Sequence, residues 1–382
     1  MKTMTSRERL LTAITQGVPD RLPVTTHHLM PYFLEKQMGG ISESAFFDQF
    51  GLDGITWFFG TTSIPADGSY LSSSGFVQTE NWMINVEDLP TTKHSTNRYK
   101  ITTPGGILTM ALASDQYTTW IVEHLIKEKR DIDLLAEYMP AVACDHDGLN
   151  QAVAKSGDRA IVRGAIPGFQ LYGQPGCWQD AACLVGIEEL ILSTYDDPAW
   201  THTLLNILKN RKKRFIESLK GAPFDLIELG GGDASSTVIS PHLFNTFVAP
   251  YDCELIKLAH ENRQRIVYHT CGGMMPILEA IADMKPDAME TFTPPAIGGD
   301  THLAEAKARI GQRVCMIGGF DQYNYLAGCS PDQTRQAVKD CFHAAGQGGA
   351  YSLCPSDHFF AANIDLLHAY ADEAHQCCYS NG

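Results

Sequence analysis

The feature that most constrains the fold of this chain is a regular alternation of short apolar runs with segments of helical periodicity. The runs have the composition of strands that are buried on both faces of a parallel sheet. Eight strands in one β–α alternation are enough to close a ring, so we predict an α/β fold of the (β/α)8 TIM-barrel type. The predicted strands are Leu22–Thr25, Gly54–Phe58, Ala160–Gly164, Asp225–Leu229, Arg265–His269, Ala288–Thr291, Val314–Gly318 and Ala350–Cys354.

The starts of several helices are marked by capping residues. Thr5 and Glu8 have the spacing of a capping box, which predicts an N-terminal helical extension before the first strand. Ser240 and Ser330 are each followed by proline, which favours a helix that begins at that point. These signals agree with helices between the predicted strands.

The first half of the chain is less regular than the second. Roughly a hundred residues separate the second and third predicted strands, far more than a βα connection needs. Within this gap the segment Tyr70–Val122 has the alternation of β-strands, so we expect a strand-rich insertion after strand 2 that lies over the barrel mouth. We predict that residues 1–382 form a single TIM-barrel domain.

Composition limits the possible partners. The formal net charge of −15 disfavours nucleic acid and anionic membranes, and a highly anionic substrate would need a local cluster of arginines. The eleven cysteines are odd in number, and the chain is too long to need disulfides for stability, so we expect reduced thiols. The start of the chain lacks the apolar stretch of a signal peptide, and we therefore expect a cytoplasmic protein. We expect a small-molecule substrate, no nucleic acid and no membrane.

The most specific local motif is His269-Thr270-Cys271-Gly272-Gly273 at the end of the fifth predicted strand. An imidazole and a thiolate two residues apart are a ligand pair that zinc favours. Cys354, at the end of the eighth strand, would complete a His/Cys/Cys set with one open position, as in a catalytic zinc site. The alternative is a buried histidine beside a core cysteine.

Other polar side chains stand where the predicted strands end, which in a TIM barrel is where functional groups gather. A carboxylate buried there needs a cation or a polar substrate to compensate it. For each residue singly, helix capping or hydrogen bonding at the barrel rim is an alternative role. The candidates are His27, His28, Glu228, Asp233, Glu290, Asp321, Asp357 and His358.

With these residues identified, the chain resembles the uroporphyrinogen decarboxylase superfamily nearly from end to end. The similarity begins at Ser6–Leu11 and Pro19–Val24, and it continues through His269–Gly272, Gly318–Asp321 and Ser356–His358. The resemblance implies a (β/α)8 barrel, in agreement with the alternation of strands and helices.

The superfamily contains two chemistries. True decarboxylases act without metal on a tetrapyrrole with eight carboxylates, which arginines after the first strand hold. Here that position reads Thr25–Met30, and no arginine occurs between Arg21 and Arg98. Carboxylates that enter a protein of this charge without such clamps meet repulsion of about 1 kcal/mol per close pair. The resemblance therefore points away from heme-pathway decarboxylation.

The second branch comprises zinc-dependent, corrinoid-dependent methyltransferases of the methylcobamide:coenzyme M type. The resemblance implies that His269 and Cys271 bind zinc, that the ion activates a thiol acceptor, and that a separate protein presents the corrinoid. Strict alignment places Asp357 where the branch has its distal cysteine, so Cys354 and the neighbouring pair Asp357 and His358 remain alternatives for the third ligand. Glu290 resembles a displaceable fourth ligand and, with Asp233, is a candidate catalytic residue. His27, His28, Glu228, Asp321, Asp357 and His358 are candidate substrate-binding residues.

Three functions remain open at this point. The first is the zinc-dependent methyltransferase. The second is a metal-free decarboxylase of the same superfamily that acts on a smaller carboxylic acid, with Asp233 or Asp321 as the acid. The third is a non-catalytic binding barrel.

Overall fold

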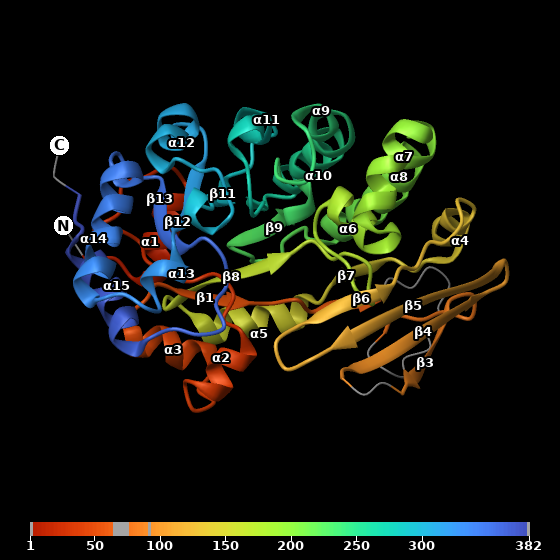
Figure 1. Ribbon diagram of the computed structural model, residues 1–382, viewed down its shortest axis with the longest axis horizontal. Helices are drawn as coiled ribbons and strands as arrows, with labels where there is room; N and C mark the ends of the chain where they lie inside the picture. The colour runs from red at the N-terminus through yellow and green to blue at the C-terminus, as the bar shows by residue number, and fades with distance from the viewer. Residues whose placement is uncertain (1–2, 64–75, 91–92, 380–382) are drawn as a thin grey trace.

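The computed structural model describes residues 3–63, 76–90 and 93–379. A curved parallel sheet occupies the middle of the molecule, with helices packed outside it and an antiparallel insertion to one side (Figure 1). The strands of the parallel sheet, in spatial order, are β1 (Gly54–Trp57), β8 (Ala160–Ala165), β9 (Leu226–Gly230), β10 (Ile266–His269), β11 (Ala288–Thr291), β12 (Cys315–Phe320) and β13 (Tyr351–Pro355).

Helices lie around the sheet (Figure 1), and most of them connect its strands, as the predicted β–α alternation requires. They are α1 (Ser6–Ile14), α2 (Pro31–Lys36), α3 (Glu43–Phe50), α4 (Asp131–Tyr138), α5 (His146–Ser156), α6 (Cys177–Val185), α7 (Ile187–Asp196), α8 (Pro198–Ser218), α9 (Pro241–Leu243), α10 (Ala249–Glu261), α11 (Leu278–Asp283), α12 (Leu303–Ile310), α13 (Gln322–Tyr325), α14 (Pro331–Cys341) and α15 (Ile364–Gln376). Short turns of 3-10 or π helix are η1 (Gly232–Ala234), η2 (Phe244–Val248), η3 (Met275–Ile277), η4 (Pro295–Ile297) and η5 (Phe342–Gly346).

The barrel prediction is confirmed, with one correction at its first strand. The segment Leu22–Thr25 is not a full strand, since it makes a single parallel bridge between Val24 and Leu353 of β13. It still closes the ring, because the Asp53 amide beside β1 donates to the Val24 carbonyl on the other side. The ladder is short because Pro23 has no N–H to donate.

The predicted helix starts are also confirmed. Thr5 and Glu8 form a capping box at α1, and Ser330 forms another at α14. The Ser240 side chain caps α9. Among the described residues, no helix has the length and apolar character needed to cross a membrane.

The predicted insertion after the second strand is present. It begins with β2 (Thr61–Ser63), which pairs antiparallel with β7 (Val142–Cys144). Between them lies a four-stranded antiparallel sheet formed by β3 (Met83–Leu89), β4 (Ser95–Thr103), β5 (Gly106–Ser114) and β6 (Thr119–Glu123). Residues 70–75 and 91–92 of the segment that we expected to be strand-rich lie outside the described residues.

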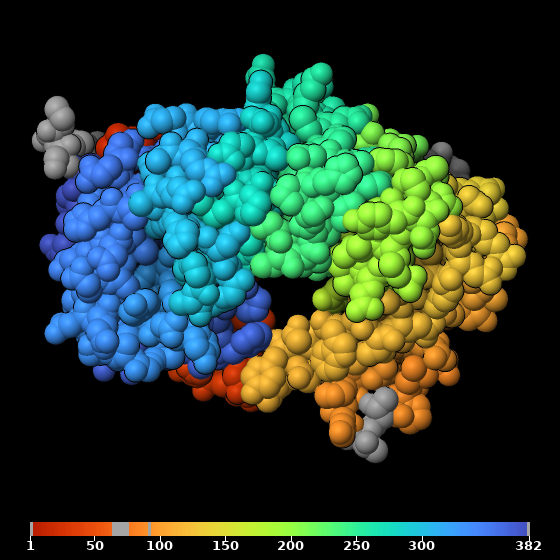
Figure 2. All heavy atoms as spheres, turned by 45° about the horizontal axis from the view of Figure 1, so that its top comes forward, coloured from red at the N-terminus to blue at the C-terminus, as the bar shows by residue number. Residues whose placement is uncertain are grey.

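The insertion reaches across the carboxyl-terminal end of the barrel. Tyr117, in the turn between β5 and β6, packs on Tyr32 of α2 with ring centroids 4.4 Å apart, and on Phe360 after β13 at 5.6 Å. An opening remains between the orange-yellow atoms of the insertion and the green and blue parts of the barrel (Figure 2). The insertion therefore forms part of the rim of the barrel mouth.

Candidate active site

Five polar or aromatic side chains share the inner face of the sheet near its carboxyl-terminal end. Trp57 pairs with Arg163, and His269 pairs with Glu290, in direct register between neighbouring strands. Glu228 pairs with the residue two positions before His269, so it lies on the same face. Period-two alternation in four adjacent strands and the register between them thus bring one guanidinium, one imidazole and two carboxylates together.

Arg163 is at the centre of this group, and its side chain is 1% exposed. It donates from Nη2 to Oε2 of Glu228 at 2.7 Å and from Nη1 to Oε2 of Glu290 at 2.9 Å. Nη2 also contacts Oε1 of Glu290, and the guanidinium carbon lies 4.5 Å from the centre of a Trp57 ring. One cation therefore faces two buried carboxylates, which leaves one negative charge for another group to balance.

Two histidines complete the group of polar side chains around Arg163. The rings of His27 and His269 stack with their centroids 5.2 Å apart. Nδ1 of His269 lies 3.0 Å from Oε1 of Glu290, and Nδ1 of His27 lies 3.8 Å from Oε2 of the same carboxylate. One donor atom each from His27, Glu228, His269 and Glu290 lies within 4.8 Å of all the others, and we call these four residues the ligand cluster.

The two stacked imidazoles have opposite electrostatic environments. Burial dominates at His27 and lowers its pKa well below the usual value. Burial also acts against the charged form of His269, but a hydrogen bond with Cys271 and the nearby carboxylates outweigh it and raise that pKa well above its usual value. Glu290 is held ionised because Arg163 outweighs the burial that would raise its pKa. The cluster thus strongly attracts positive charge.

Cys271 and Cys354 both lie near the ligand cluster but outside its four residues. Cys271 is partly exposed, and its sulfur packs against Gly232. A Cβ added to this glycine would stand only 2.6 Å from the sulfur. Cys354 pairs with Gly319 in the barrel wall and is 2% exposed. Burial, followed by the negative charge of Glu290, raises the pKa of the Cys354 thiol well above its usual value. Of the two predicted thiol ligands, Cys271 has the more suitable surroundings.

A cavity of about 650 Å³ opens above the ligand cluster, within the size range of small-molecule sites. Its described lining includes Glu228, Asp233 and Asp357 but neither lysine nor arginine. Most of the residues that we predicted for the site line it: His27, His28, Glu228, Asp233, His269, Cys271, Asp357 and His358.

The two remaining acidic candidates at the cavity rim differ in their partners. Asp357 accepts from Nδ1 of His358 at 2.8 Å, and burial opposed by that contact leaves the Asp357 pKa below its usual value. Asp233 is held by Gln179, whose Nε2 donates to Oδ2 at 2.7 Å, while burial raises the Asp233 pKa. Asp233 is therefore the carboxyl group at the rim that most readily holds a proton.

Asp321 has a different position from the other predicted site residues. Its carboxylate caps α13, where Oδ1 accepts from the Asn324 amide at 2.9 Å and Oδ2 from the Asn324 side chain at 2.7 Å. It is not among the described residues that line the cavity. Helix capping, the alternative that the sequence left open, accounts for its contacts.

Arg163 and Trp57 were not among the residues predicted for the site. The missed signal was a charged residue inside the run Ala160–Ala165, whose other residues are small or apolar. A buried arginine in a barrel strand requires anionic partners, and that alone would have pointed to the inner carboxylates. Trp57 Nε1 and Arg163 Nε are buried and have no hydrogen-bond partner among the described residues.

The residues at this site fit a zinc ion by their chemistry. Two imidazoles, two carboxylates and an adjacent thiol are donors of the kinds that zinc binds. The contact from Nδ1 of His269 to Glu290 is the arrangement in which a carboxylate orients a metal-binding histidine and leaves Nε2 for the ion.

Comparison with known proteins places this site in a family. The profile of the family described as uroporphyrinogen decarboxylase (URO-D) matches residues 161–360, more than half of the chain. The chain belongs to the uroporphyrinogen decarboxylase family. The matched segment contains Arg163, Glu228, His269 and Glu290, so most of the buried polar group lies within it.

The curated relatives that match the chain are named uroporphyrinogen decarboxylase. The chain is 27% identical over 195 residues to a uroporphyrinogen decarboxylase from Chromohalobacter salexigens, which is 47% of this chain and 52% of that protein. It is 27% identical over 209 residues to the Aliivibrio fischeri enzyme, 51% of this chain and 55% of that protein. The chain thus spans about half the length of the curated relatives it matches.

Among solved structures, a methyltransferase from Methanosarcina mazei is similar over 98% of this chain and 99% of its own, with a TM-score of 0.63 and 15% identity. This similarity confirms the TIM-barrel fold of the family.

Proposed function

We propose that this protein is a zinc-dependent methyltransferase that moves a methyl group between a corrinoid and a thiol. The observation that carries the proposal is the convergence of the ligand cluster beside Cys271 at the carboxyl-terminal end of the barrel. The similarity in fold to a protein named methyltransferase supports it. A zinc ion held here would lower the pKa of a substrate thiol, which makes the thiol a nucleophile near neutral pH.

Each residue of the site has a proposed part. His269 and Cys271 hold the ion, and His27 and Glu228 offer further donors. Arg163 fixes Glu290, and Glu290 in turn orients His269 through the 3.0 Å contact to Nδ1. In this proposal Glu290 has an orienting role, in place of the displaceable ligand that the resemblance implied, and Cys354 stays protonated in the barrel wall.

The cavity favours a substrate with few negative charges. Its acidic side chains and its lack of lysine or arginine among the described lining residues disfavour a substrate with many carboxylates. The arginine closest in sequence after Arg21, Arg98, is engaged with Glu123 inside the insertion. We propose that a separate corrinoid protein presents the methyl group at the barrel mouth.

The metal content of the protein tests this proposal. We expect about one equivalent of zinc in protein purified without added metal, and its loss in His269→Ala or Cys271→Ser. Methyl transfer from methylcobalamin to a thiol, followed by absorbance under anaerobic conditions, should fall with the zinc. His260→Ala is a matched control, because His260 pairs with Asp287 at the opposite end of the barrel. Less than about a tenth of an equivalent of zinc in folded protein would contradict the mechanism.

A second candidate is a metal-free decarboxylase that acts on a small carboxylic acid. The names of the curated relatives and the raised pKa of Asp233 at the cavity rim favour it. Carbon dioxide release that persists after chelation and in His269→Ala, but is lost in Asp233→Asn, would establish this activity in place of methyl transfer.

A further inference from the structure

A second pocket opens off the first at the same end of the barrel. Its volume is about 240 Å³, and it shares His28, Gln174 and Glu228 with the larger cavity. The remainder of its wall comes mainly from the segment after β1, the segment after β8, and two phenylalanines. We call it the ring pocket, and it is lined by His28, Trp57, Phe58, Phe59, Gly60, Thr61, Ala165, Ile166, Pro167, Gly168, Gly173, Gln174, Pro175, Phe215, Phe224 and Glu228.

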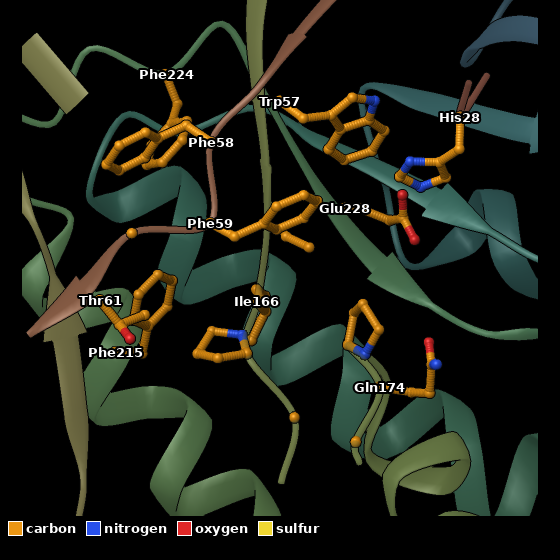
Figure 3. A pocket seen from close by; sticks show the side chains of 16 residues that line it. His28, Trp57, Phe58, Phe59, Thr61, Ile166, Gln174, Phe215, Phe224 and Glu228 are labelled. Carbon is orange, nitrogen blue, oxygen red and sulfur yellow. The ribbon is translucent and has the colours of Figure 1, made fainter. Parts of the chain in front are cut away.

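The two sides of the ring pocket differ in polarity. The polar side chains of His28, Glu228 and Gln174 lie on one side of the view in Figure 3. Phe58, Phe215 and Phe224 lie on the other side together with the hydroxyl of Thr61, and Phe59 lies between the two groups. A ligand that extends from the ligand cluster past Glu228 would therefore meet aromatic side chains.

Size and charge limit what this pocket can bind. Cavities of about 150 Å³ accommodate a benzene molecule, so this volume is enough for a ring with a small substituent. None of the 16 described lining residues is lysine or arginine, so a carboxylate or sulfonate on the ring would lack a partner.

A cationic group fits this pocket less well than a neutral ring, because Glu228, the one carboxylate among its described lining residues, already accepts from Arg163 at 2.7 Å. The indole of Trp57 already has the Arg163 guanidinium at 4.5 Å and the ring of His28 at 4.1 Å. Phe59 also stacks on Trp57, with ring centroids 5.3 Å apart. The most electron-rich ring is thus engaged, and the remaining phenylalanines offer apolar surface.

We infer that the ring pocket binds an uncharged aromatic ring of the substrate, with the methyl-exchanging sulfur directed toward the ligand cluster. The identity of the reacting atom rests on the proposed function, whereas the binding of the ring rests on the pocket alone. Glu228 connects the two sites, because it belongs to the ligand cluster and also lines the ring pocket.

Binding measured by calorimetry on the purified full-length chain tests the inference. We expect phenylmethanethiol to bind zinc-loaded protein at least about tenfold more tightly than 2-mercaptoethanesulfonate or 4-(mercaptomethyl)benzoate. 2-Mercaptoethanesulfonate lacks the ring and carries a charge, whereas 4-(mercaptomethyl)benzoate keeps the ring and adds a charge. Equal affinities for the three thiols would overturn the proposal.

Substitutions in the pocket sharpen the test. Phe59 is 59% exposed, so the Phe59→Ala protein should fold, and its affinity for phenylmethanethiol should be about threefold to tenfold lower. Thr61→Trp should fill the pocket and abolish binding of the ring while leaving zinc content unchanged. Tyr195→Ala on α7 is a matched control, because Tyr195 is 69% exposed and is not among the residues that line the ring pocket. A folded Thr61→Trp protein with unchanged affinity would contradict the assignment.

A ligand without sulfur separates this inference from the proposed function. Benzyl alcohol should bind protein that has been treated with a chelator, and Thr61→Trp should prevent that binding. If this pattern holds in a protein that has neither zinc nor methyl transfer, only the proposed function fails. If zinc and methyl transfer are present but Thr61→Trp changes the affinity for neither benzyl alcohol nor phenylmethanethiol, only the assignment of the ring pocket fails.

Discussion

The two ends of the barrel both bury arginine–carboxylate pairs, but they arrange them differently. At the amino-terminal end, Asp53, Asp225 and Asp287 stand just before β1, β9 and β11. Each accepts a backbone N–H from the neighbouring strand in the ring, at 2.8 to 2.9 Å. Each also has its own basic partner on a helix or in the N-terminal segment. These carboxylates are spread around the ring, and each connects neighbouring segments.

At the carboxyl-terminal end the charges converge. Glu228 and Glu290 share one guanidinium, and His27 and His269 crowd against them within 4.8 Å. Such crowding is costly for stability unless a ligand or ion uses it. The ionic pairs at the amino-terminal end thus connect neighbouring segments of the fold, whereas those at the carboxyl-terminal end converge where TIM barrels place their functional groups.

The largest effect should come from Arg163→Met, which leaves two buried carboxylates without their cation. We expect the free energy of unfolding of metal-free protein to fall by about 3–5 kcal/mol, measured by urea denaturation. Saturating zinc should recover part of this loss, because a divalent cation can compensate the same carboxylates. A loss that zinc leaves unchanged would mean that the two ends do not differ in the way described.

Arg9→Met is the counterpart at the other end and should have a smaller effect. Arg9 binds Asp20 and Asp53, but Asp53 keeps Arg21 at 3.1 Å and the Val24 amide at 2.9 Å. We therefore expect a loss of about 2–3 kcal/mol in the same denaturation experiment. Zinc should not recover any of it, and recovery equal to that of Arg163→Met would remove the contrast between the ends.

The sequence predicted the regular parts of this molecule better than its charged centre. Seven of the eight strands and the caps at Thr5, Ser240 and Ser330 follow from local patterns, since periodicity and capping are properties of neighbouring residues. The weak first strand was over-predicted because its apolar composition concealed the effect of Pro23.

The candidate site was predicted only in part, for a physical reason. Strand ends could be recognised one by one, so His269, Glu290 and Glu228 were named. Which of them meet depends on register and on side-chain reach: register places His269, Glu290 and Cys354 on one face, yet Cys354 is not part of the four-residue ligand cluster. Register and the partners of a long side chain such as Arg163 are set by tertiary packing, which a single sequence does not show.

The smallest and most controlled comparison lies within one strand. Asp225 precedes β9 at one end of the barrel, and Glu228, three residues later on the same strand, belongs to the ligand cluster. Both carboxylates bind an arginine, yet their partners differ in exposure, since the Arg7 side chain is 36% exposed and that of Arg163 is 1% exposed.

Asp225→Asn should lower the free energy of unfolding by about 1 kcal/mol and leave zinc content unchanged. The effect should be small because the side-chain amide can still accept from the Val162 N–H, and because solvent partly screens the pair with Arg7. Glu228→Gln should change stability by less than about 1 kcal/mol, because the amide oxygen can still accept from Nη2 of Arg163. It should nevertheless reduce zinc affinity about tenfold or more, measured by competition with a chelator. If instead Asp225→Asn lowered zinc affinity as much as Glu228→Gln, the two ends would be coupled through β9 and the separation of their roles would be wrong.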